Sequence, residues 1–202
     1  MTEFSRRRLL ALAAATPALY ALPALANEER LTGDVVIGDE NAPLTVIEYA
    51  SLTCSHCASF HKRTWPEFKA NYVDTGKVRF IMREVYFDPY GLWAGMLARC
   101  GGREAYYPMV DQILNRQAEW SRAEDVAVAL KKIGRVNGLS SERMNACMTD
   151  RPFAEALIAD YQNNAEADGI RSTPSFVIEG DVHTGAMGYD EFSALVERYL
   201  GS

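Results

Sequence analysis

Two cysteines, Cys54 and Cys57, lie three positions apart where a strand-like segment meets a helical one. Residues 44–51 are rich in β-branched and aromatic side chains, as buried strands are, and a helix kinked at Pro66 is predicted from Cys54 toward Tyr72. A Cys-x-x-Cys pair between a strand and a helix is typical of a redox-active dithiol. The unpaired N–H groups and the positive dipole end of the first helical turn would stabilise a thiolate at Cys54.

His56 lies between the two cysteines and offers the thiolate a cationic or hydrogen-bonding partner. Such surroundings lower a cysteine pKa from about 8.5 to between roughly 3.5 and 7.5. A low pKa makes Cys54 a good leaving group, so its disulfide with Cys57 would pass readily to the thiols of another protein. We therefore predict that Cys54 is the nucleophile, that Cys57 is the resolving thiol, and that His56 stabilises the thiolate.

The elements around this motif predict an α/β domain interrupted by helices. A strand at 77–85 follows the first helix, a hairpin pairs 176–178 with 182–184 around a turn at Gly180-Asp181, and a helix at 190–200 closes the domain. Five helical segments intervene: Pro89–Arg99, Glu104–Arg116, Arg122–Ile133, Ser140–Met148 and Pro152–Asp168. We expect residues 27–87 and 169–202 to form one domain, with residues 88–168 inserted as a helical subdomain.

The first 26 residues differ in composition from the rest. The sequence Ser-Arg-Arg-Arg-Leu-Leu leads into an Ala/Leu-rich run that ends at Ala24-Leu25-Ala26, which is typical of an export signal cleaved after Ala26. Two prolines interrupt the apolar run, and it is shorter than the about 20 residues that span a membrane. The arginines resemble a twin-arginine signal and also suit a Sec leader, so both routes to the periplasm stay open.

Cleavage of this leader would leave a strongly acidic chain. The leader holds three Arg and one Glu, so the formal net charge changes from −6 to −8 when it is removed. No Lys/Arg-rich run remains to favour nucleic acid or anionic lipid as a partner. The remaining length suits one well-packed domain.

Cys100 and Cys147 fall in two of the predicted inserted helices. They could be buried free thiols, but export and the even number of cysteines favour a structural disulfide. Closing a loop of this length could stabilise the fold by up to about 4 kcal/mol, less any strain.

Taken together, these residues and motifs resemble the DsbA-like thiol:disulfide oxidoreductases of the thioredoxin superfamily. The resemblance covers most of the mature chain and rests on Cys54-Ser-His-Cys57, on Glu48 six residues earlier, on Thr173-Pro174 and on the long helical segment. The family usually has Cys-Pro-His-Cys, so the serine leaves the redox potential open. The resemblance implies a thioredoxin fold with an inserted helical subdomain.

The resemblance also implies roles for three residues outside the dithiol. Thr173 and a cis Pro174 would lie opposite the dithiol and present backbone groups to an extended substrate. Glu48 would lie beneath the dithiol and assist proton movement. The alternative is that it merely faces solvent or an ion pair, because a carboxylate on a central strand is costly to bury, and we favour the role in proton movement.

By the same resemblance, the chain would donate disulfides to reduced exported proteins, need no cofactor, and be reoxidised by a quinone-linked membrane protein of the DsbB type. Only Asn27–Asp34 precede the first strand, so we expect a monomer without a dimerisation domain, which favours an oxidase. Thr173 before the proline is shared by some isomerases of the superfamily, so an isomerase or reductase stays an alternative.

A metal site is a competing interpretation of the cysteines. Cys54, Cys57 and a histidine could bind Zn²⁺, but there is only one Cys-x-x-Cys, and His61 and His183 are isolated in the sequence. We therefore expect no metal site.

Overall fold

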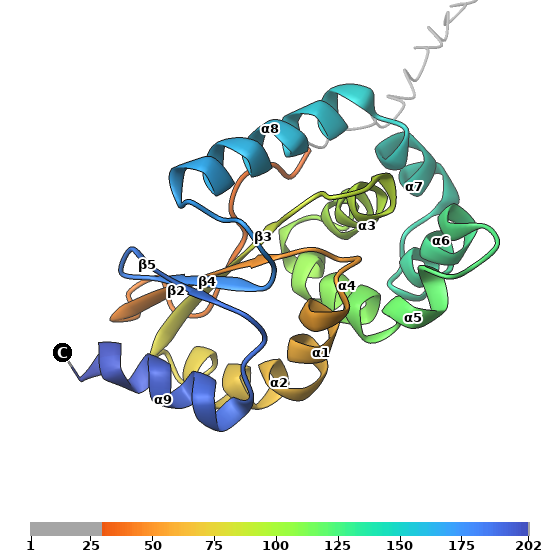
Figure 1. Ribbon diagram of the computed structural model, residues 1–202. Helices are drawn as coiled ribbons and strands as arrows, with labels where there is room; N and C mark the ends of the chain where they lie inside the picture. Colours follow the sequence, from red (N-terminus) through yellow and green to blue (C-terminus); the bar gives the residue numbers. More distant parts are fainter. Residues whose placement is uncertain (1–29, 202) are drawn as a thin grey trace, which may run out of the picture.

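The computed structural model describes residues 30–201, so the predicted export signal lies outside the described residues. Its five-stranded sheet has the order β1-β3-β2-β4-β5 (Figure 1). β2 and β3 are parallel, and the other neighbouring strands are antiparallel. The strands are β1 (Val36–Ile37), β2 (Leu44–Ala50), β3 (Val78–Glu84), β4 (Ser175–Ile178) and β5 (Asp181–Thr184).

The central strand β2 is buried on both faces, and its side chains alternate between two cores. Val46 and Ala50 belong to the larger core, which α1 (Ser55–Arg63), α2 (Trp65–Phe68) and α9 (Tyr189–Leu200) cover. Tyr49 belongs to a smaller core beneath α8 (Arg151–Ala167). Helices therefore cover both faces of the sheet, with α8 on one side and α1, α2 and α9 on the other (Figure 1).

The helix predicted from Cys54 toward Tyr72 is broken in two places. α1 ends at Arg63, α2 follows, and a π-helical segment, η1, covers Lys69–Val73. Pro66 sits in the first turn of α2, where its missing N–H costs nothing, so the proline starts a new helix and does not merely kink an old one.

Six helices lie between β3 and β4, where the sequence predicts five. The predicted helix at Arg122–Ile133 begins four residues late, because the Asp125 side chain caps it by accepting a hydrogen bond from Val128 N at 2.9 Å. The short helix α5 (Gln117–Trp120) was not predicted separately. Within residues 30–201, no helix has the length and apolar character needed to cross a bilayer. The six helices between β3 and β4 are α3 (Pro89–Cys100), α4 (Arg103–Asn115), α5 (Gln117–Trp120), α6 (Val126–Val136), α7 (Ser141–Met148) and α8.

Most Met and aromatic residues of these helices form a core. Met96, Met109, Tyr106 and Trp120 are almost completely buried. At Gly134 a Cβ atom would overlap with the Met144 sulfur and with a methyl group of Leu97, so the glycine allows α6 to pack closely against both side chains.

The C-terminal hairpin turns one residue earlier than predicted. Its two-residue loop is Glu179-Gly180, and both residues have positive φ, 49° and 89°. Paired positive φ angles match the twist of a tight hairpin, so β5 begins at Asp181.

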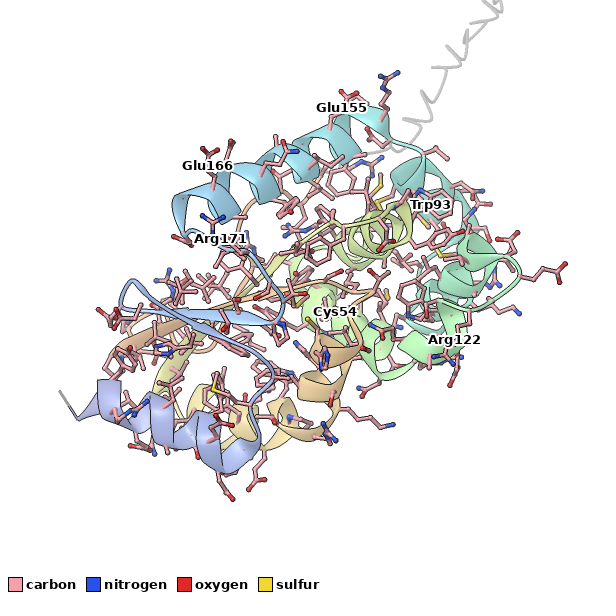
Figure 2. All side chains as sticks on the ribbon, in the orientation of Figure 1. Cys54, Trp93, Arg122, Glu155, Glu166 and Arg171 are labelled. Atoms are coloured by element: carbon pink, nitrogen blue, oxygen red, sulfur yellow. A yellow bond between two sulfur atoms is a disulfide. The ribbon has the colours of Figure 1, made fainter. Side chains whose placement is uncertain are left out.

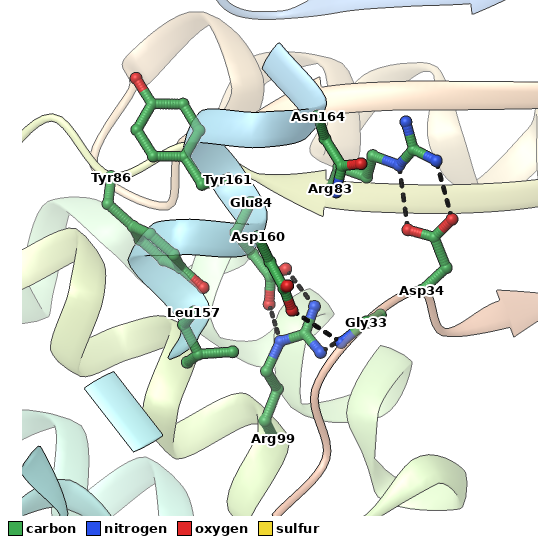
Figure 3. A pocket seen from close by; sticks show the side chains of 10 residues that line it. All are labelled: Gly33, Asp34, Arg83, Glu84, Tyr86, Arg99, Leu157, Asp160, Tyr161 and Asn164. Atoms are coloured by element: carbon green, nitrogen blue, oxygen red, sulfur yellow. Dashed lines mark hydrogen bonds and ion pairs between the residues drawn. The ribbon is translucent and has the colours of Figure 1, made fainter. Parts of the chain in front are cut away.

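An ion pair attaches the segment before β1 to the sheet, and hydrogen bonds attach it to α3 (Figure 3). The buried Arg99 guanidinium contacts Glu84 at 2.5 Å and donates to the Gly33 carbonyl oxygen at 2.9 Å. Arg83 contacts Asp34, also at 2.9 Å. These groups line a pocket of about 20 Å³, which is room for one water molecule.

A disulfide joins Cys100, the last residue of α3, to Cys147 in α7. The two Cα atoms are 6.0 Å apart, and both side chains are buried. The bond links helices that are 47 residues apart in the sequence, inside the inserted region.

We expect the double variant Cys100→Ala, Cys147→Ala to unfold at a lower temperature than the oxidised parent. Losing the closed loop should reduce the free energy of unfolding by up to about 4 kcal/mol, because the unfolded chain regains conformational freedom. Thermal unfolding followed by circular dichroism measures the change. The Cys54→Ala, Cys57→Ala pair, which closes a much shorter loop, is the matched control, and equal losses in both variants would contradict the role of loop closure.

Candidate active site

Cys54 is the N-cap residue of α1, directly after the turn that leaves β2. Its backbone is extended, with φ −79° and ψ 121°, and its N–H donates to the Ser51 carbonyl oxygen at 3.0 Å. Figure 2 shows Cys54 where the chain enters α1. Both Cys54 and Cys57 are free thiols, so the structure represents the reduced dithiol.

Two sets of hydrogen bonds hold the turn before Cys54. The Thr53 hydroxyl donates to the Asp88 carboxylate at 2.6 Å, and Asp88 in turn caps α3 by accepting from Gly91 N at 2.9 Å. On the other side, the buried Gln117 amide donates to the carbonyl oxygens of Leu52, at 2.8 Å, and of Cys54, at 2.9 Å. The inserted helices therefore fix the backbone of the dithiol turn.

The environment of Cys54 favours its thiolate. A hydrogen bond from the Cys57 thiol is the largest influence, and it outweighs the opposing effect of burial. The Thr173 side chain and the backbone N–H groups of Cys57 and His56 add further hydrogen bonds. Together they lower the pKa of Cys54 to about 5.

Cys57 has the opposite properties, although it lies in the same helical turn. It is fully buried, and its pKa is raised well above the usual value, first by its hydrogen bond to Cys54, then by burial and by the charge of Glu48. The site therefore holds one half-buried thiolate beside one buried thiol.

The His56 side chain is exposed. Its contribution to the pKa of Cys54 comes through the backbone N–H group at the start of α1. A side-chain contribution from His56 therefore stays a prediction.

Glu48 is completely buried on β2, and its carboxylate contacts His61. The distance from Glu48 Oε2 to His61 Nε2 is 2.8 Å. Glu48 therefore does not face solvent, and its carboxylate is paired with His61 inside the protein.

The loop before β4 lies opposite the dithiol. The Thr173-Pro174 peptide bond is cis, and the Cys54 thiol is 3.5 Å from the Thr173 carbonyl oxygen. The Pro174 carbonyl oxygen accepts from Gly185 N at 2.9 Å, and the Ser175 hydroxyl donates to Ser172 O at 2.8 Å. These bonds leave Thr173 as the part of the loop that contacts Cys54.

Sequence reasoning missed three residues of this site. His61 is not isolated but fully buried beside Glu48, and Asp111 of α4 lies 3.6 Å from its other ring nitrogen. The spacing from Cys57 to His61 places both on one face of α1, so this signal was present in the sequence. Gln117 gave no signal, because its partners are backbone atoms distant in the chain. Among the described residues, no three His, Cys, Asp or Glu side chains are arranged to hold a metal ion.

Comparison with known proteins agrees with this geometry. The family model described as "Thioredoxin" matches residues 30–198. A Rickettsia bellii protein, whose name classes it provisionally as a protein-disulfide oxidoreductase, is 34% identical over 168 residues. That match covers 83% of this chain but only 64% of the relative, so the chain spans less than two thirds of that protein's length.

Solved structures share the architecture. Wolbachia pipientis alpha-DsbA1 is 31% identical, with a TM-score of 0.78, and the match covers 85% of this chain and 92% of that one. BdbD from Bacillus subtilis, in its oxidised form, has a TM-score of 0.75 at 19% identity, which supports the fold alone. The chain therefore belongs to the thioredoxin family, and within that superfamily to the DsbA-like proteins.

Proposed function

We propose that the chain is a periplasmic thiol:disulfide oxidoreductase that donates the Cys54–Cys57 disulfide to reduced exported proteins. The observation that carries this proposal is the contrast between the two sulfurs, a half-buried Cys54 with a pKa of about 5 beside a buried Cys57 with a raised pKa. The name of the Rickettsia bellii relative supports the same reaction class.

The reaction follows from the accessibility of the two sulfurs. In the oxidised protein, a substrate thiolate attacks Cys54 Sγ, the sulfur that is open to solvent, and the Cys54–Cys57 bond breaks. Cys57 leaves as a thiolate and takes up a proton. A second substrate thiolate then attacks the substrate sulfur of the mixed disulfide, and Cys54 leaves as a stable thiolate. The substrate loses two electrons and the dithiol gains them.

The low pKa of Cys54 sets the direction of transfer. The pKa of Cys54 falls from 9.0 to about 5 in the folded reduced protein. The ionised Cys54 therefore stabilises the reduced form fully above pH 9, the pKa in the unfolded chain, and this stabilisation decreases with pH until it is lost below about pH 5. At neutral pH, midway between these two pKa values, about half of this stabilisation remains, and it still favours the reduced form over the disulfide. Such a disulfide is a strong oxidant.

Thr173 and Pro174 are the proposed substrate-binding residues. Thr173 contacts the Cys54 sulfur, and Pro174 has no N–H group to compete for that sulfur. Phe87 and Tyr90, which are 60% and 45% exposed, lie beside Asp88 near the start of α3, so they offer apolar contacts to an unfolded chain close to the dithiol.

The remaining site residues act on the proton and the thiolate. Glu48 is the proposed proton acceptor for Cys57, because its charge acts on that buried thiol. His56 is proposed to support the Cys54 thiolate from the exposed side of the turn.

The proposed location and partners rest on separate features. The leader predicted at residues 1–26 and the Cys100–Cys147 disulfide both suit an oxidising compartment. We propose that the protein acts as a monomer, and that a membrane quinone reductase of the DsbB type returns the dithiol to the disulfide.

We expect Cys54→Ser to abolish disulfide transfer, because the sulfur that a substrate attacks is gone. Cys57→Ser should instead accumulate mixed disulfides when it is mixed with a disulfide-bonded protein, because Cys54 still attacks that disulfide but no Cys57 thiol remains to release the partner. Oxidation of a reduced, unfolded test protein measures transfer, and non-reducing electrophoresis detects the mixed disulfides. Ordinary transfer by Cys54→Ser would disprove the assignment.

We expect the thiolate absorbance of the reduced protein to titrate near pH 5. Cys57→Ala should raise the pKa of Cys54 by at least about one unit, because it removes the strongest hydrogen bond to the thiolate. His56→Ala should raise it by less, and Ser55→Ala, an exposed neighbour on the same turn, is the control. A midpoint that stays near pH 5 in Cys57→Ala would show that this bond does not control the thiolate.

A further inference from the structure

A buried ionic cluster extends from Glu48 to the surface of α4. His61 is fully buried, with Nε2 2.8 Å from Glu48 Oε2 and Nδ1 3.6 Å from Asp111 Oδ1. The Asp111 side chain is 36% exposed, so it connects the cluster to solvent. The second oxygen of Glu48, Oε1, has no hydrogen-bond partner within residues 30–201, which leaves it free to receive a proton.

The surroundings of His61 favour the positively charged form of its imidazole. Burial alone would lower its pKa, but the charge of Glu48, the hydrogen bond with Glu48 and the nearby Asp111 carboxylate raise the pKa to about 9. A buried carboxylate without a cation is costly, so this charge offsets the cost of keeping Glu48 ionised.

Few other titratable groups act on this pair. Tyr107 of α4 interacts electrostatically with Glu48, and Cys57 lies one turn before His61 on α1. α2 contributes Trp65, whose ring centroid is 5.6 Å from that of His61 and which does not titrate. The charge balance of the site therefore depends mainly on Glu48, His61 and Asp111.

We propose that His61 is a positioning residue for the dithiol chemistry: held between Glu48 and Asp111 as an imidazolium, it keeps Glu48 ionised as the proton acceptor for Cys57. This inference rests on the proposed function, in which Glu48 receives that proton. On this proposal, α1 supplies both the resolving thiol, Cys57, and, one turn later, the cation, His61, that keeps Glu48 ionised.

The step that depends on His61 is the closing of the active-site disulfide. The proton of the Cys57 thiol moves to Glu48, and the Cys57 thiolate attacks Cys54 Sγ in a mixed disulfide. The Cys54–Cys57 bond forms, the bond from Cys54 to the partner sulfur breaks, and the electron pair leaves on the partner as its thiolate. Cys54 and Cys57 end as the disulfide, the partner sulfur is reduced, and Glu48 later releases the proton to solvent.

The test uses the reduced protein and 5,5′-dithiobis(2-nitrobenzoate). Cys54 attacks this reagent first and releases one coloured thiolate, and Cys57 then closes the disulfide and releases a second. Reducing the protein with one equivalent of dithiothreitol should leave Cys100–Cys147 intact, and two thiolates released per chain would verify it. The rate of the second release, followed by stopped-flow absorbance between about pH 5 and 9, reports the step at Cys57.

We expect His61→Gln to slow the second release at least about tenfold near neutral pH, and to move the midpoint of its pH profile upward, because Glu48 loses its cation. The first release should change less than about twofold, since Cys54 does not depend on Glu48. A general loss of structure would not shift one pH profile alone. Asp111→Asn, at a partly exposed carboxylate, should shift the midpoint in the same direction by less.

Two matched controls lie outside the cluster. His183→Gln changes a histidine that is bonded to Tyr199, and Glu104→Gln changes an exposed carboxylate on α4, so neither should alter the second release. An unchanged rate and midpoint in His61→Gln would overturn the inference, and if that variant does not fold, unchanged values in Asp111→Asn would overturn it.

Glu48→Gln separates this inference from the proposed function. If Glu48→Gln slows the second release and His61→Gln does not, only the role of His61 fails. If Glu48→Gln also leaves the second release unchanged, the proposed proton transfer to Glu48 fails as well.

Discussion

The hydrogen bond between the two sulfurs of the dithiol determines the properties of the site. The Cys57 thiol donates to Cys54, and this one contact lowers the pKa of Cys54 while raising that of Cys57. The bond requires Cys54 at the N-cap of α1 and Cys57 in the first turn of the helix, where it is buried. The hydrogen bonds of Thr53 and Gln117 hold the turn in that position, so the inserted helices support the chemistry without supplying a reacting atom.

Much of the fold could be predicted from the sequence, because local patterns determine it. β2 reads as a buried strand from its apolar residues, and Ser140 caps α7 by accepting a hydrogen bond from Arg143 N, as its residue type suggests. The errors arose where local signals compete. Pro66, predicted to kink one helix, starts a new one. The helix predicted from Arg122 begins only at Val126, because Asp125 provides the stronger N-cap.

The candidate site was predictable only in part. A spacing pattern places Cys54 and Cys57, and the resemblance to DsbA-like proteins supplied Glu48 and Pro174. Neither source reveals that Glu48 is paired with His61, or that Asp111 completes the cluster, because Asp111 comes from a helix 50 residues away from His61. Contacts that depend on tertiary packing leave little trace in a single sequence, whereas the i, i+4 spacing of Cys57 and His61 did leave one.

The equilibrium of the Cys54–Cys57 pair with glutathione tests the central claim most directly. If the thiolate of Cys54 is stabilised as its surroundings indicate, the reduced form is favoured, and the reduction potential should lie above about −180 mV, the range of disulfide isomerases. A potential near about −270 mV, as in thioredoxins that act as reductants, would contradict the account, because it would mean that folding does not favour the thiolate over the disulfide.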